Sequence, residues 1–120
     1  MKAIIFFGHG ARDARWREPF SRLASLWCSQ HPDTSVELAF LEIMQPSLEQ
    51  AISSLVSQGA NQIVIVPVFL GQGGHLRNDF PALLSTCQDK FPAIKLSTTP
   101  AVGEDEAVLQ AIIDFGARTL

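Results

Sequence analysis

Hydrophobic residues along the chain follow two alternating patterns. Short, uninterrupted apolar runs are typical of strands buried on both faces, and they predict strands at residues 4–7, 36–41 and 62–70. Apolar residues at helical spacing predict helices over residues 14–30 and 46–58, and a third helix that starts at Asp79 and buries residues as far as Cys87. A weaker strand over residues 93–97 and a last helix beginning near residue 104 complete the alternation.

This alternation predicts an α/β fold: one domain over residues 1–120 with an open four-stranded parallel sheet and helices on both faces. The expected strand order is 2-1-3-4, with the β-branched run 62–70 near the centre. Pro67 lacks an N–H for pairing, so regular pairing should loosen towards the end of that run. Asp79 is expected to cap the third helix, with Pro81 in its first turn. Five apolar residues should bury the last helix against the sheet: Val108, Leu109, Ile112, Ile113 and Phe115.

Three residues with chemically useful side chains follow the predicted strands. His9 lies between Gly8 and Gly10, Glu42 follows the second apolar run, and a glycine-rich segment after the third leads to His75. Because ligands bind at the carboxyl ends of parallel strands, these three side chains are expected to converge at one edge. The alternatives are a turn histidine bonded only to backbone, and a carboxylate on the solvated lip of the sheet.

Two imidazoles and a carboxylate form a candidate site for a divalent first-row metal. A closed structural zinc site normally has four protein ligands, so a metal held here would keep open positions. The glycines of residues 71–74 also suggest a phosphate-binding loop, but no Lys-Ser/Thr pair follows them.

Composition narrows the possible partners. The net charge of -3 and pI near 5.5 argue against nucleic-acid binding. Four of the nine Lys and Arg residues nevertheless follow closely after His9: Arg12, Arg15, Arg17 and Arg22.

No stretch is long enough to span a membrane, and the first apolar run is too short for a secretory signal, so a cytoplasmic location is expected. Cys28 and Cys87 lack metal-site or redox spacing and are interpreted as reduced packing residues.

Three motifs carry a resemblance to a known family. Gly8-His9-Gly10-Ala11-Arg12 resembles the amino-terminal motif of the small class II chelatases, which include sirohydrochlorin cobaltochelatases, ferrochelatases and nickelochelatases. Residues 38–42 with 46–48, and residues 66–75, are similar to the family's second strand and helix and to its third strand and ligand loop. Ala11 stands where the family often has serine, and residues 98–103 match less clearly.

The resemblance implies a chelatase-like, flavodoxin-like fold and insertion of a divalent metal into sirohydrochlorin or a related tetrapyrrole. Co²⁺ is the first choice, with Ni²⁺ or Fe²⁺ as alternatives; the reaction needs no ATP and no permanently bound cofactor. His9 and His75 would hold the metal, and Glu42 would orient it or accept a pyrrole proton. The tetrapyrrole contacts implied are Arg12, Phe69, Leu70, Gly73, Gly74 and Leu76, with Arg15 and Arg77 as further partners for its carboxylates.

The resemblance also implies a symmetric homodimer with the tetrapyrrole between the subunits. Two other functions stay open at this stage. One is a metal or tetrapyrrole carrier that keeps the fold but does not catalyse insertion. The other is a phosphoryl transferase that uses His9, which would require a phosphate cradle that the chain supplies only in part.

Overall fold

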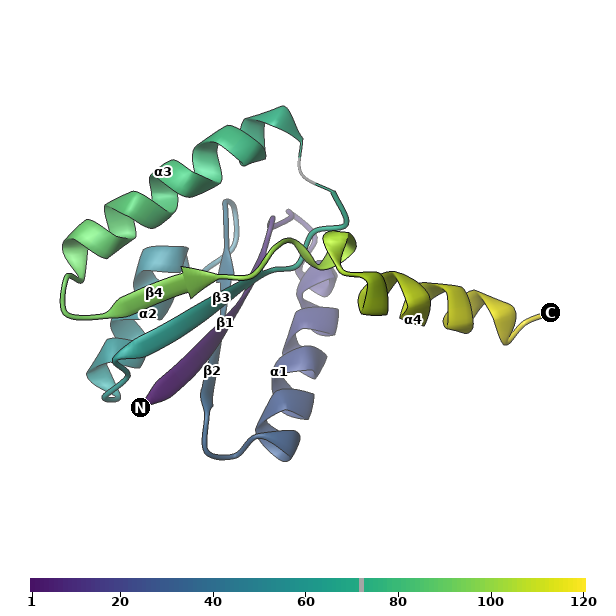
Figure 1. Cartoon of the computed structure of the whole chain (residues 1–120), viewed down its shortest axis with the longest axis horizontal. Helices are drawn as coiled ribbons and strands as arrows, with labels where there is room; N and C mark the ends of the chain where they lie inside the picture. The colour runs from purple at the N-terminus through teal and green to yellow at the C-terminus, as the bar shows by residue number, and fades with distance from the viewer. Residues whose placement is uncertain (72) are drawn as a thin grey trace.

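The computed structural model describes residues 1–71 and 73–120, and the side chains of all of these except residues 74–76. Its centre is a four-stranded, wholly parallel sheet in the order β2-β1-β3-β4 (Figure 1). The strands are β1 (Lys2–Gly8), β2 (Ser35–Phe40), β3 (Gln62–Pro67) and β4 (Lys95–Thr98). The predicted fold class and strand order are therefore confirmed.

Three helices connect the strands in chain order, and a fourth follows the last strand. They are α1 (Glu18–Gln30), α2 (Leu48–Ser57), α3 (Gly74–Lys90) and α4 (Glu106–Ala117), with 3-10 turns η1 (Ala14–Arg17) and η2 (Val102–Glu104) before the first and last. Local sequence explains where α1 and α2 begin. Pro19 lies in the first turn of α1, and Ser47 and Gln50 form a reciprocal capping box at the start of α2.

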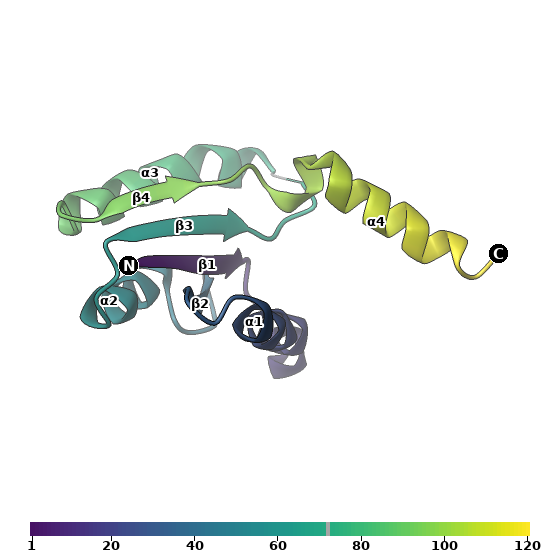
Figure 2. The same ribbon diagram turned by 60° about the horizontal axis from the view of Figure 1, so that its bottom comes forward.

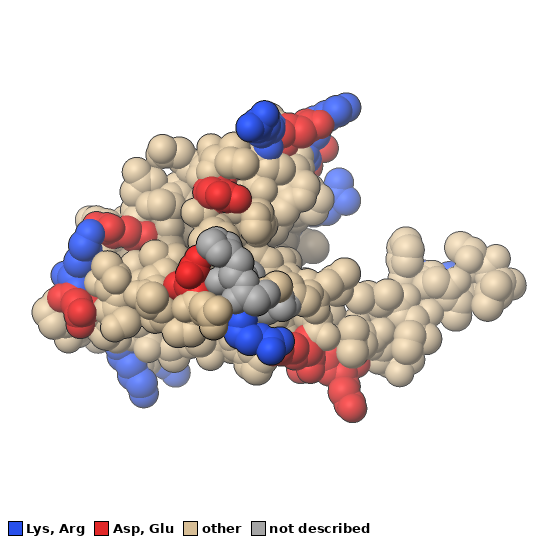
Figure 3. Space-filling model, turned by 90° about the horizontal axis from the view of Figure 1, so that it is seen from above, with Lys and Arg blue, Asp and Glu red and all other residues tan. Residues whose placement is uncertain are grey.

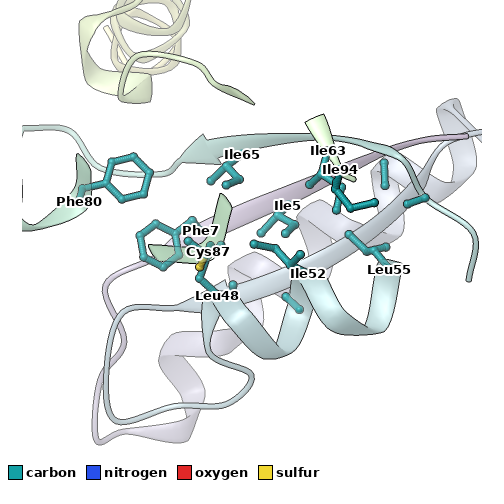
Figure 4. Packing of buried hydrophobic residues seen from close by; sticks show 14 of the residues in the cluster. Ile5, Phe7, Leu48, Ile52, Leu55, Ile63, Ile65, Phe80, Cys87 and Ile94 are labelled. Atoms are coloured by element: carbon teal, nitrogen blue, oxygen red, sulfur yellow. The ribbon is translucent and has the colours of Figure 1, made fainter. Parts of the chain in front are cut away.

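The sheet separates two apolar clusters. On one face, Ile5, Phe7, Ile63 and Ile65 pack against α2 and α3 (Figure 4). On the other face, Phe6 and Phe40 pack against α1 through Trp27 and Phe20. Alternate residues of β1 therefore supply both clusters, as expected for a strand buried on both faces.

The structure corrects two boundaries around the third helix. β3 ends at Pro67 rather than at residue 70, because proline cannot donate to the ladder. α3 begins at Gly74 with Gly73 as its cap, so Asp79 and Pro81 lie inside the helix. The proline was misleading as a start signal, because a helix interior can also accommodate one at the cost of a backbone hydrogen bond.

The predicted burial of the last helix is wrong. None of the residues of α4, all of which the structure describes, is buried. Figures 1 and 2 show the helix pointing away from the sheet and from the other helices. Leu109, Ile112, Ile113 and Phe115 are instead between 42% and 66% exposed.

The cysteines are both free, but only Cys87 is a buried packing residue, whereas Cys28 is exposed. Burial raises the pKa of the Cys87 thiol. Within the described part of the chain, no helix is both long and apolar enough to cross a bilayer.

Candidate metal-binding site at the sheet edge

Parallel pairing between β1 and β2 positions His9 beside Glu42. Gly8 lies opposite Phe40 in the register, and backbone hydrogen bonds continue beyond both strands. The Leu41 N–H donates to the Gly8 carbonyl at 2.9 Å, and the Glu42 N–H donates to the His9 carbonyl at 3.2 Å. Backbone hydrogen bonds therefore hold the two residues side by side, independently of any contact between their side chains.

The side chains of His9 and Glu42 also meet, with the imidazole Nε2 3.1 Å from the carboxylate Oε1. Both are accessible: 51% of the histidine side chain and 57% of the glutamate side chain are exposed. The buried Phe69 presents its ring nearly perpendicular to the imidazole, with 6.5 Å between ring centroids. The pair thus has an apolar neighbour on one side and solvent on the other.

Gly10 permits the close approach of the two segments. Its φ of +101° lies in the left-handed region, and a Cβ built on it would lie 1.9 Å from the Glu42 carbonyl oxygen. The segment after Glu42 is tightly turned as well. Ile43 has a φ of 70°, and the Met44 N–H donates to the Glu42 carbonyl at 2.7 Å. Glu42 is therefore fixed at the backbone, although its carboxylate is exposed.

Replacing Gly10 by alanine should displace Glu42 and destabilise the fold. The left-handed backbone alone costs a residue with a Cβ about 1–2 kcal/mol, and the contact with the Glu42 carbonyl adds to this. Urea unfolding monitored by circular dichroism measures the loss. Gly59→Ala is the matched control, because Gly59 also has a positive φ, of +103°, but no atom lies within 4 Å of its built Cβ. Equal losses of stability in the two variants would show that the contact with the Glu42 carbonyl does not contribute to the free energy of unfolding.

The segment after β3 is held by the loop that follows β4. The Gly103 N–H donates to the Phe69 carbonyl at 2.9 Å, and a Cβ at Gly103 would lie 1.7 Å from the Leu70 carbonyl oxygen. Phe69 is consequently fixed beneath His9, while the Leu70 side chain is 69% exposed. Of the predicted apolar contacts in this segment, Phe69 forms a wall of the site and Leu70 is a surface residue.

The arginines after His9 are in different situations. Arg15 binds Asp13 through its guanidinium, with the shortest contact at 2.7 Å, and this hydrogen bonding raises the pKa of Arg15 and lowers that of Asp13. Arg17 donates to the Gln45 carbonyl and stacks over Phe40, 5.1 Å from the ring centroid.

Arg12 is exposed, and none of the hydrogen bonds or ion pairs in the described part of the chain involves its side chain. Of the three arginines that follow His9 most closely, Arg12 is therefore the one best able to receive an anionic ligand. The structural role of Arg17 was missed from the sequence, since it depends on the path of residues 41–46. The pairing of Arg15 with Asp13, two residues away, was a local signal that the sequence did contain.

The remaining predicted residues lie on the first turn of α3. The backbone of His75 belongs to this turn, and its side chain, like those at Gly74 and Leu76, lies outside the described residues. Gly73 is the exposed N-cap of the helix. Among the side chains that are described, no group of three or more His, Cys, Asp or Glu residues is placed to hold a metal. The structure thus shows the His9–Glu42 pair and leaves the third predicted ligand as a prediction.

The parallel sheet of this order is shared with solved CbiX and SirB chelatase structures, which places the chain in the chelatase-like class of α/β proteins. The crystal structure of a CbiX protein from Marinobacter aquaeolei VT8 has a TM-score of 0.86 with this chain and 29% sequence identity. The match covers 99% of this chain and 97% of that one. A family model described as CbiX matches residues 3–116, and the chain belongs to the CbiX family.

Curated relatives extend the comparison. The sirohydrochlorin ferrochelatase of Bacillus subtilis is 30% identical over 112 residues, which are 92% of this chain and 42% of the relative. The sirohydrochlorin cobaltochelatase of Priestia megaterium is 32% identical over 116 residues, 93% of this chain and 36% of the relative. The chain thus spans well under half the length of these two relatives.

Proposed function

We propose that the protein inserts a divalent metal into sirohydrochlorin or a closely related tetrapyrrole. The observation that carries the proposal is the accessible pair of His9 and Glu42 at the carboxyl edge of the sheet, 3.1 Å apart. Family membership and the names of the relatives, which include both a ferrochelatase and a cobaltochelatase, support the same function.

The separation of Nε2 and Oε1 suits two ligands of one cation. Imidazole nitrogen and carboxylate oxygen bind first-row metals at about 2.1 Å, and atoms 3.1 Å apart then subtend an angle of about 95° at the metal. Both side chains are more than half exposed, so a cation held between them would be accessible from solvent. His75, in the first turn of α3, is the proposed second imidazole.

Metal insertion exchanges one cation for two pyrrole protons, so the site needs ligands that release the metal and groups that take up protons. The neutral His9 imidazole would bind the incoming ion, because a protonated ring cannot coordinate. As the ion moves to the macrocycle nitrogens, Glu42 or the freed imidazole would accept the two pyrrole protons in turn and pass each to water. This exchange requires no nucleotide.

The surroundings of the pair are consistent with a large, acidic macrocycle. Phe69 would lie against its apolar face, and Leu70, Leu76, Gly73 and Gly74 are the proposed neighbours from the segment that leads into α3. Arg12 would bind a peripheral carboxylate through two parallel hydrogen bonds. Arg77 is the second candidate for this role, whereas Arg15 would first have to leave Asp13.

Co²⁺ is the metal we propose, in a cytoplasmic homodimer, with Ni²⁺ and Fe²⁺ as alternatives. The test follows the absorbance of sirohydrochlorin with each ion in turn, with and without the protein and without ATP. Acceleration above the spontaneous rate supports a chelatase, and the ion with the largest acceleration identifies the metal. Binding of sirohydrochlorin and metal without acceleration would favour a carrier instead.

Substituting glutamine for Glu42 separates its two proposed roles. Glutamine keeps the shape and one oxygen ligand but cannot accept a proton, so we expect the insertion rate to fall about tenfold or more while Co²⁺ affinity falls less. Isothermal titration with Co²⁺ and the absorbance assay measure the two quantities. Glu37→Gln is the control, because Glu37 lies on β2, the strand that leads to Glu42, but its carboxylate accepts a hydrogen bond from Ser54 of α2. Equal reductions of affinity and rate would assign Glu42 to metal binding alone.

A further inference from the structure

The segment that carries Glu42 runs over residues 41–46, between the end of β2 and the start of α2, and we call it the carboxylate loop. Its two ends are tied together, because the Phe40 N–H donates to the Pro46 carbonyl at 2.9 Å. Its middle turns back on itself through the hydrogen bond from the Met44 N–H to the Glu42 carbonyl at 2.7 Å. The Met44 side chain packs against the apolar cluster on the α1 side of the sheet.

One residue of the carboxylate loop has an unfavourable backbone conformation. Ile43 has a φ of 70°, in the left-handed region, where the Cβ of an L-residue lies too close to the following carbonyl oxygen. A β-branched residue is a genuine outlier there. The Ile43 side chain is 63% exposed, so its own packing does little to hold this conformation. Contacts made by neighbouring residues must hold it instead, because a strained residue persists only where its surroundings determine its geometry.

Arg17, at the end of the turn η1, makes two such contacts from outside the carboxylate loop. Its guanidinium donates to the Gln45 carbonyl and lies over the Phe40 ring, 5.1 Å from the ring centroid. These two partners lie on either side of Ile43 along the chain, so Arg17 connects the two arms of the loop. In the part of the chain that the structure describes, the only other side chain that hydrogen-bonds to the loop from elsewhere is that of His9.

Arg17 is better suited to holding a loop than to binding an anion. The cations on the face of the molecule seen in Figure 3 lie mostly around its margins, where solvent and ligands reach them. Arg17 is instead partly buried, and its guanidinium already has two partners within the chain. A planar guanidinium can donate a hydrogen bond and stack on an aromatic ring at the same time, whereas the ammonium of lysine is a point charge.

We infer that Arg17 positions Glu42, by holding the carboxylate loop in the conformation that places the carboxylate 3.1 Å from the His9 imidazole. Without the guanidinium, Ile43 would be free to relax to a negative φ, and the peptide that joins it to Glu42 would rotate. The carboxylate would then move away from His9, although no group that touches the metal or the tetrapyrrole had been removed. The inference rests on the proposed metal insertion and adds to that site a positioning residue from outside the sheet edge.

Arg17→Met is the first test, because methionine keeps an unbranched side chain over the Phe40 ring but cannot donate to the Gln45 carbonyl. We expect the initial rate of Co²⁺ insertion into sirohydrochlorin, followed by absorbance, to fall about tenfold. Arg22→Met is the matched control, because it removes an exposed arginine from α1 that makes neither of these two contacts. The control should keep the parent's rate. A full rate in Arg17→Met, or an equal loss in both variants, would overturn the inference.

A second substitution distinguishes positioning from general support of the fold. Asparagine adopts the left-handed region more readily than isoleucine, because its short polar side chain can hydrogen-bond locally. In a background with Ile43→Asn the loop has less strain to release, so adding Arg17→Met should lower the rate by only about threefold or less. If Arg17 served only to stabilise the fold, asparagine at this position would not compensate for its loss. A tenfold fall in this background as well would therefore overturn the inference.

Hydrogen exchange of backbone amides, measured by NMR, tests the loop without any insertion assay. Arg17→Met should speed exchange of the Glu42 and Met44 amides at least about fivefold, and change exchange across β3 much less. Unchanged exchange of these two amides would overturn the positioning role even in an active chelatase. If the parent chain accelerates no insertion, the proposed function fails, and the exchange rates still show whether Arg17 holds the loop.

Discussion

His9→Ala is expected to lower the rate of metal insertion by two to four orders of magnitude. The imidazole is both a proposed metal ligand and a neighbour of Glu42, at 3.1 Å, so its removal eliminates one ligand and leaves the carboxylate without its partner. The side chain is 51% exposed and makes little contribution to the core, so the variant should fold. The initial rate of the sirohydrochlorin absorbance change with Co²⁺ measures the effect.

A second histidine provides a matched control for His9. His31 lies after α1, stacked on Trp27 with 4.2 Å between ring centroids, and is not part of the sheet edge. His31→Ala removes the same chemical group from another surface and should retain nearly the full rate. If His9→Ala also retained it, or if both variants lost it equally, the proposed site would be wrong.

Phe7→Ala should have the largest effect on stability, a loss of about 3–5 kcal/mol in the free energy of unfolding. Phe7 is fully buried on β1, and its ring stacks on Phe80 of α3 at 5.4 Å and meets Phe69 edge-on at 5.9 Å. Truncation leaves a cavity between the sheet and α3 and removes two aromatic contacts. Urea unfolding at a fixed protein concentration measures the loss.

Phe7→Leu distinguishes a loss of stability caused by the cavity from one caused by any substitution at this position. Leucine retains much of the buried apolar surface and should lose clearly less than alanine. Because Phe69 also lies beside His9, we expect Phe7→Ala to weaken Co²⁺ binding modestly even under conditions where the variant is folded. A loss below about 1 kcal/mol for Phe7→Ala would mean that α3 can close over the gap.

The sheet was predictable because its signals are local and strong. Apolar runs too short for helices, separated by helical periods, indicate parallel strands, and the connection rules then limit the strand order. The proximity of His9 and Glu42 followed from that order, since both residues come directly after neighbouring strands. No side-chain detail was needed to predict that they would lie at the same edge.

The features that sequence could not supply depend on contacts between distant segments. The close approach of Gly10 to the Glu42 carbonyl depends on the path of the loop after β2, which hydrophobic patterns do not describe. The outward direction of α4 was missed because an apolar stripe shows that a helix needs a partner, without showing whether the partner is its own sheet or another chain. The same pattern is compatible with either arrangement.

The strand register has a consequence for how this chain can vary in evolution. His9 and Glu42 are 33 positions apart in sequence, but backbone hydrogen bonds from the ends of β1 and β2 determine their spacing. Insertions in the turn between α1 and β2 should therefore be neutral for the pair, however much they lengthen the connection. A single residue gained or lost between Phe40 and Glu42 would turn the carboxylate to the other side of the backbone. Natural length variation should be common in the first region and absent from the second.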